Sequence, residues 1–238
     1  MRLGKANRIV SALALGAAMT AAVATTPETA NAALMVQATV GGAPTGVSYV
    51  SFDSLSLGNA GGVSNGITVS YTGTGRTVQG AASGLYAAPF LSNSNGVPFG
   101  IAGNGADPTR YLSTGIGSVV MVLPGDMKYF GLLWGSVDNY NTLEFWNDGV
   151  LIGSLTGTDI WAGANGDQGA NGTFYVNVNS TQVFDKVVAK SSQYAFELDN
   201  VAYNTQSTVP EPATWTLLIA ALLSLSWMVR RRRASVRA

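Results

Sequence analysis

The sequence predicts an all-β fold, a two-sheet jelly-roll-like β-sandwich, on three observations. The stretch 33–208 is rich in Gly, Ser, Thr, Asn and Val, and its apolar and polar residues alternate in short runs. Turn-forming residues separate these runs at regular spacing, and no part of the stretch has a sustained helical period. A period of two indicates strands with one buried face, and many short strands with turns between them are typical of sandwiches and barrels.

The first half of this stretch contains three strand signals and one long connection. Residues 34–40, 47–52 and 67–71 predict strands, and the segment Gly41-Gly42-Ala43-Pro44 predicts the first turn. Residues 72–107 are dominated by Gly, Ser and Asn. Because a connection of this length is unusual in a compact domain, we expect it to hold a short strand, near 85–90, or to form a functional surface.

The second half has denser strand signals. A continuous apolar run predicts a central strand at 118–123, and Pro124-Gly125-Asp126 predicts a turn before a strand at 129–134. Further strands are expected at 142–146, 150–155, 173–178, 183–189 and 194–203.

One hairpin is predicted by its turn. Asn147-Asp148-Gly149 separates the runs 142–146 and 150–155, and Asp-Gly favours a tight hairpin because Gly accepts positive φ. In the first of these strands, Leu143 and Phe145 share one face, while Glu144 and Trp146 share the other.

Charge and missing residue types exclude several classes of function. Residues 33–208 contain five Lys and Arg against eleven Asp and Glu, a formal charge of −6. Nucleic-acid binding is therefore not expected, because it needs a basic surface. The chain has no Cys and no His, which excludes disulfides, thiolate nucleophiles, zinc–thiolate sites and a Ser-His-Asp triad. Carboxylate chemistry remains open.

The first 32 residues have the pattern of a secretory signal peptide. Arg2, Lys5 and Arg8 precede an apolar, Ala-rich run at 9–23, and Ala30-Asn31-Ala32 provides a small-x-small cleavage pattern before Ala33. Cleavage after Ala24 is the alternative. We expect one domain at 33–208 after removal of 1–32.

The last thirty residues, 209–238, combine three features. The first is the motif Val209-Pro210-Glu211-Pro212-Ala213, in which 209–212 are expected to be extended because Pro fixes φ and lacks an N–H. An uncharged apolar run at 213–229 follows, short for a single transmembrane helix across a core of about 30 Å. The basic cluster Arg230, Arg231, Arg232 and Arg233 then favours a cytoplasmic C-terminus.

This segment resembles the sorting signal of PEP-CTERM proteins, in which the same three features occur in the same order. The resemblance implies recognition by an exosortase-like membrane protease of a Gram-negative bacterium. The precursor would be tethered to the inner membrane, cleaved near the Pro-Glu-Pro motif, and delivered to the cell surface or extracellular matrix. The segments 129–146 and 196–202 also look like segments of PEP-CTERM surface proteins, and 196–202 is similar to the last strand of jelly-roll carbohydrate-binding modules.

Two kinds of site besides the sorting motif are suggested by the residues. Hard oxygen ligands suit Ca²⁺, and the candidate ligands are Asp138, Asn139, Asn141, Asp199 and Asn200, with Asp53 as a further one. The alternative is that these side chains bond their own backbone in turns. Trp146 and Trp161 are candidates for stacking on a sugar ring, whereas Trp134 and Phe145 are expected in the core.

A carboxylate pair for glycoside hydrolysis is the least favoured alternative. The candidate acids are Asp138, Glu144, Glu197 and Asp199. The simpler interpretation is that Glu144, Asp148 and Glu197 face solvent, and that Asp138 and Asp199 organise turns. The sequence therefore favours a non-enzymatic structural or adhesive surface protein without a cofactor. The alternatives are a lectin-like module that binds extracellular polysaccharide and, last, a glycoside hydrolase.

Overall fold

The fold is all-β, as predicted. The computed structural model describes residues 33–208, so the predicted signal peptide and sorting segment lie outside the described residues. Within this range no helix is long and apolar enough to cross a membrane. Its strands are β1 (Leu34–Thr39), β2 (Ser48–Val50), β3 (Gly62–Ser64), β4 (Ile67–Gly73), β5 (Arg76–Gln79), β6 (Phe90–Leu91), β7 (Gly105–Ala106), β8 (Arg110–Thr114), β9 (Gly117–Gly135), β10 (Asn141–Asn147), β11 (Val150–Thr156), β12 (Phe174–Ser191) and β13 (Phe196–Asn204).

Helical structure is limited to two short elements among the described residues. These are the 3₁₀ turn η1 (Val97–Phe99) and the one-turn helix α1 (Gly157–Ile160). The side chain of Asp159 caps α1 by accepting hydrogen bonds from the N–H and the hydroxyl of Thr156, both at 2.7 Å.

Antiparallel pairing joins eleven strands into one hydrogen-bonded sheet. Its central path is β11-β10-β12-β9-β13-β8-β5, with β1 beside β12, β2 beside β13, and β4, which carries β3, beside β9. The strands β6 and β7 form a separate pair. The jelly-roll-like connection of two sheets stays a prediction.

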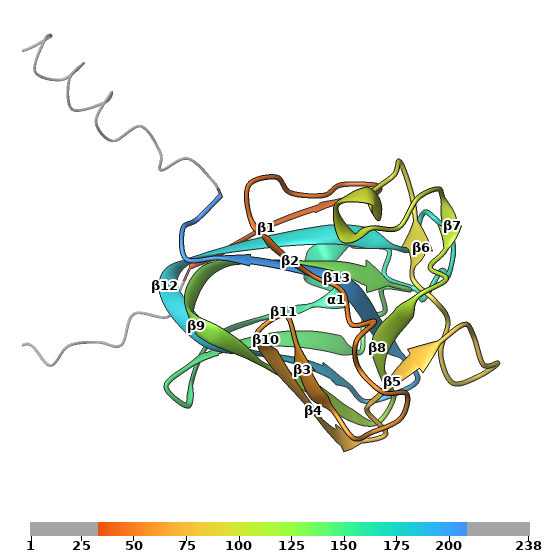
Figure 1. Ribbon diagram of the computed structural model, residues 1–238, viewed down its shortest axis with the longest axis horizontal. Coiled ribbons are helices and arrows are strands. Elements are labelled where there is room, and N and C mark those ends of the chain that lie inside the picture. Colours follow the sequence, from red (N-terminus) through yellow and green to blue (C-terminus); the bar gives the residue numbers. More distant parts are fainter. Residues whose placement is uncertain (1–32, 209–238) are drawn as a thin grey trace, which may run out of the picture. The chain divides into compact units, whose positions relative to one another are not determined.

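The strands β9 and β12 give the sheet its two layers. Residues 174–179 of β12 pair with 129–134 of β9, whereas 186–191 pair with 117–122. Figure 1 shows both strands curving at one edge of the fold, so that their two halves lie in opposite layers. The first layer contains β1, β13, β8 and β5, and the second contains β4, β10 and β11.

The predicted turn at Pro124-Gly125-Asp126 is wrong, because these residues lie within β9. The ladder partners of β9 are interrupted between Val122 and Met127, and this is where a Pro without a donor is tolerated in a strand. The two strands predicted at 173–178 and 183–189 are likewise a single strand, β12. A local turn signal cannot tell a bend inside a strand from a break between two strands.

The main core lies between the two layers. The largest buried side chains include Trp134, Phe130, Phe145, Phe184 and Phe196. The faces predicted for the 142–146 strand are confirmed, since Leu143 and Phe145 are both fully buried. The hairpin turn is confirmed as well, with positive φ at Asp148 (48°) and Gly149 (80°).

The connection predicted at 72–107 to hold a strand or a functional surface contains β5, which pairs with β8 in the first layer. The rest folds over the outer face of that layer. Here residues 80–109 are called the covering loop. It contains β6, β7 and η1, and its strand begins at Phe90, not at residue 85. A small apolar cluster joins it to the sheet, with Leu91 and Ile101 from the loop and Leu133 and Tyr175 from the strands. The outer face of β13 is therefore covered.

Candidate functional site

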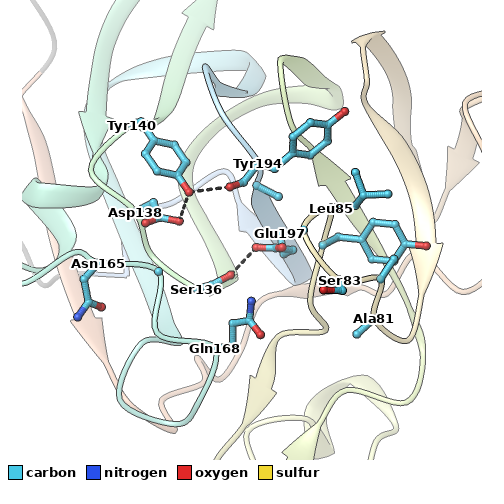
Figure 2. A pocket seen from close by; sticks show the side chains of 15 residues that line it. Ala81, Ser83, Leu85, Ser136, Asp138, Tyr140, Asn165, Gln168, Tyr194 and Glu197 are labelled. Atoms are coloured by element: carbon cyan, nitrogen blue, oxygen red, sulfur yellow. Dashed lines mark hydrogen bonds between the residues drawn. The ribbon is translucent and has the colours of Figure 1, made fainter.

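A polar pocket lies beside β13, between the covering loop and the loops that follow β9 and α1. Its volume is about 490 Å³. Figure 2 shows Ser136, Asp138, Tyr140, Gln168 and Glu197 around it. Segments that are distant in sequence form its wall, namely 81–86, 136–140, 165–168, and 194–197.

Glu197 lies at the inner wall of the pocket and is 2% exposed. Its neighbour Phe196 points into the core, so the alternation of β13 directs Glu197 toward the covering loop. The hydroxyl of Ser136 donates to Oε2 at 2.5 Å, and the N–H of Ala87 donates to Oε1 at 2.9 Å. The sequence interpretation of Glu197 as a solvent-facing residue is therefore wrong.

Burial raises the pKa of Glu197 to about 7, although hydrogen bonds from Ser136 and Ala87 act in the opposite direction. The negative charge of Asp138 makes a smaller contribution to this raised pKa. Near neutral pH, a small change around Glu197 can therefore change its charge.

Asp138 forms a second polar centre in the same pocket. The hydroxyl oxygen of Tyr140 lies 2.5 Å from Oδ2 of Asp138 and 2.8 Å from the carbonyl oxygen of Tyr194. A phenol has a single hydrogen, so the Tyr140 hydroxyl can donate either to Asp138 or to the carbonyl of Tyr194. Burial raises the pKa of Asp138, and the hydrogen bond from Tyr140 acts in the opposite direction.

Gly166 closes one side of the pocket against Asp138. It has φ of 73°, and a Cβ at this position would lie 2.7 and 2.8 Å from the two carboxylate oxygens. Its N–H donates to the carbonyl of Val137 at 3.1 Å. Only Gly satisfies both the backbone conformation and the close approach.

Neither candidate tryptophan lines this pocket. Trp146 is half-buried on the outer face of β10, where its Nε1 donates to Glu144 at 3.0 Å and Nζ of Lys186 lies 4.7 Å from the ring centroid. Trp161 ends α1 and packs on Phe174 with ring centroids 5.7 Å apart. Both rings are already in contact with the protein on one side.

The structure divides the predicted calcium ligands between two places. Asp138 borders the pocket, Asn139 is exposed, and Asn141 donates its amide to the carbonyl of Ala195 at 3.0 Å. Asp199 and Asn200 are buried in β13, so Asp199 does not organise an exposed turn. Within residues 33–208, no three Asp, Glu, His or Cys side chains gather closely enough to hold a metal.

Three other acids named in the sequence analysis lie outside the pocket. Glu144 forms an ion pair with Lys190 at 2.7 Å on the second layer. Asp148 is exposed at the hairpin turn, as predicted. Asp53 accepts a hydrogen bond from the N–H of Arg110 at 3.0 Å. The sorting motif Val209–Ala213 and the basic cluster Arg230–Arg233 lie outside the described residues.

Sequence reasoning missed most of the pocket. Ser136, Gln168, Tyr86 and Tyr194 line it, yet each belongs to a segment with no motif of its own. The one usable signal was the unusual length of the covering loop. The class that fold and site define is an all-β domain with a polar, carboxylate-bearing pocket. Comparisons with known protein families, with curated proteins and with solved structures returned no match to this chain.

Proposed function

We propose that this chain is an exported surface or extracellular-matrix protein whose domain binds a saccharide in the polar pocket. The observation that carries the proposal is the pocket itself, about 490 Å³ in volume and lined by hydroxyl, amide and carboxyl groups from several segments. Such groups match a neutral ligand rich in hydroxyls, since each hydroxyl both donates and accepts. The fold proposed for this module is the jelly-roll-like sandwich.

Two tyrosines add the apolar component that a sugar ring needs. Tyr194 is 41% exposed, and Tyr86 of the covering loop lines the same pocket. Aromatic rings provide a flat surface and a polar tip. We therefore assign ring contacts to Tyr86 and Tyr194 in preference to Trp146 and Trp161.

Export and sorting are proposed from the terminal segments. The signal-like residues 1–32 and the PEP-CTERM-like residues 209–238 support delivery by an exosortase-like enzyme to the surface or matrix. A matrix protein that binds a polysaccharide would act as an adhesive component, which unites the structural and lectin-like hypotheses. We propose no catalytic step.

Binding is tested with the purified full-length chain on a glycan array and in polysaccharide pulldowns. The detergent must lack a sugar headgroup, because 213–229 is apolar and a maltoside would compete. We expect saturable binding that falls at least tenfold in Gln168→Ala and Glu197→Gln. Glu144→Gln is the matched control, since Glu144 is a carboxylate outside the pocket.

The outcomes separate the alternatives. Binding lost in Trp146→Ala but kept in Glu197→Gln would place the ligand on the second layer and refute the pocket. No binding by a folded chain would leave a purely structural role. Shortened saccharide products that disappear in Glu197→Gln would instead show a glycoside hydrolase.

A further inference from the structure

Two buried carboxyl groups, those of Asp107 and Asp199, interact beneath the covering loop, and neither lines the pocket. Asp199 is fully buried on β13, where it lies opposite Leu133 of β9, which in turn lies opposite Tyr175 of β12. Asp107 follows β7 in the covering loop and is 1% exposed. Its N–H donates to the carbonyl of Pro89 at 2.8 Å, which fixes the end of the loop.

These carboxyl groups lack the partners that buried charges need. Oδ1 of Asp107 accepts from the N–H of Thr109 at 2.8 Å and from its hydroxyl at 2.5 Å. Oδ2 of Asp107 and both carboxylate oxygens of Asp199 accept no hydrogen bond of good geometry. The backbone N–H of Asn200 and the carboxyl group of Asp107 are the polar groups that interact with Asp199. Both amide atoms of Asn200 are buried and without a partner too. A buried carboxylate without compensation is strongly unfavourable.

No basic side chain compensates this charge. The ion pair found within residues 33–208 joins Lys190 to Glu144, on the second layer. Arg110, close to Asp107 in sequence, donates instead to the carbonyls of Asp53 at 3.1 Å and Leu55 at 2.6 Å. Burial, and then the charge of Asp107, raise the pKa of Asp199 well above its usual value. The pair therefore requires either a shared proton or a bound cation.

We propose that Asp107 and Asp199 bind a Ca²⁺ ion that fixes the covering loop to β13. Two carboxylates supply up to four of the about six to eight oxygens that Ca²⁺ takes, and carbonyl and amide oxygens commonly supply others. The unpaired side-chain oxygen of Asn200, adjacent to Asp199, is the first candidate among these. Mg²⁺ fits less well because it usually keeps several waters, whereas this pair is enclosed.

An ion at this position would also affect the pocket, because the covering loop forms part of the pocket wall. The covering loop contributes Leu91 and Ile101 to the small cluster beneath it, and Phe99 packs on Tyr175. The same loop supplies residues 81–86 of the pocket and the N–H that bonds Glu197. An ion between Asp107 and Asp199 would therefore hold the pocket wall in place, a consequence that rests on the proposed function.

The test measures metal content and thermal unfolding of the full-length chain in detergent, with Ca²⁺ alone as the probe. After loading and dialysis against metal-free buffer, we expect one tightly bound Ca²⁺ per chain. Chelation should lower the Tm by several degrees, as expected for a ligand that binds only the folded state. Asp107→Asn and Asp199→Asn should lose the ion and the chelator effect, whereas Asp126→Asn, an exposed acid in β9, should keep both.

Two results would overturn the proposal. Wild-type chain that retains no Ca²⁺ and shows the same Tm with and without chelator would show that a shared proton compensates the pair. Retention of Ca²⁺ by both variants would place the ion elsewhere. If a variant does not fold, the wild-type metal content decides the question together with Asn200→Ala, which should weaken binding. Saccharide binding that persists in chelator would reject the coupling without affecting the saccharide proposal.

Discussion

Trp134 and Phe196 stack with ring centroids 4.2 Å apart and an interplanar angle of 16°. This contact anchors β13 to β9 on the core side. Successive residues of a strand point to opposite faces, so with Phe196 in the core the side chains of Glu197 and Asp199 point to the outer face. The core packing and the two candidate sites are thus set by the same strand.

Phe196→Ala should therefore destabilise the fold strongly. Removing a fully buried aromatic side chain costs about 3–5 kcal/mol. Urea unfolding followed by tryptophan fluorescence measures the loss. Leu57→Ala is the control, because Leu57 is 55% exposed and its truncation should change the free energy of unfolding by less than about 0.5 kcal/mol. Equal losses in the two variants would contradict the stacking arrangement.

Gly166→Ala should damage the pocket more than the fold. Its Cβ would meet the Asp138 carboxylate at under 3 Å, so the wall must shift and saccharide binding should fall at least tenfold. Gly103→Ala is a matched control with φ of 93° and open space around the added Cβ. Both variants carry backbone strain of about 1 kcal/mol. Isothermal titration with the saccharide should therefore show weaker binding by Gly166→Ala than by Gly103→Ala. Unchanged binding in Gly166→Ala would show that Gly166 does not border the binding site.

Asp138→Asn should change how stability depends on pH. The pKa of Asp138 is raised above 3.8 in the folded chain, chiefly by burial. The folded state thus holds its proton more tightly, so this contribution to stability is present below pH 3.8 and is lost as pH rises through the raised pKa. The free energy of unfolding of the wild type, relative to Asp138→Asn, should decline over that window. Parallel profiles of the wild type and Asp138→Asn would contradict the shift.

Replacement of Pro210, Glu211 and Pro212 by alanine should block sorting. Fractionation and immunoblotting should show an uncleaved form in the membrane fraction, because the apolar run 213–229 stays attached. Alanine at Thr205, Gln206 and Ser207 is the control and should be processed normally. Normal release of the Pro-Glu-Pro variant would reject the PEP-CTERM-like interpretation.

Many of the strands, and the faces of the 142–146 strand, were predictable because alternation and turn chemistry are local properties, whereas β3 and β8 were not predicted. The 142–146 and 150–155 hairpin illustrates this, since Asp148-Gly149 specifies the turn and Leu143 and Phe145 specify the buried face. The continuity of β9 was not predictable, since Pro124 signals a turn locally, whereas pairing on both sides of it keeps the strand in the sheet.

The all-β class, the acidic character of residues 33–208, and the absence of His and Cys chemistry follow from the amino-acid sequence alone. Which acids are buried, and which groups they contact, depends on the tertiary structure. Glu197 and Asp199 alternate with core residues along β13, and this local pattern predicts that they face solvent. They are buried because the covering loop, distant in sequence, folds over that face and brings Ala87 to one and Asp107 to the other. Burial by such a loop depends on long-range packing, which no local pattern encodes.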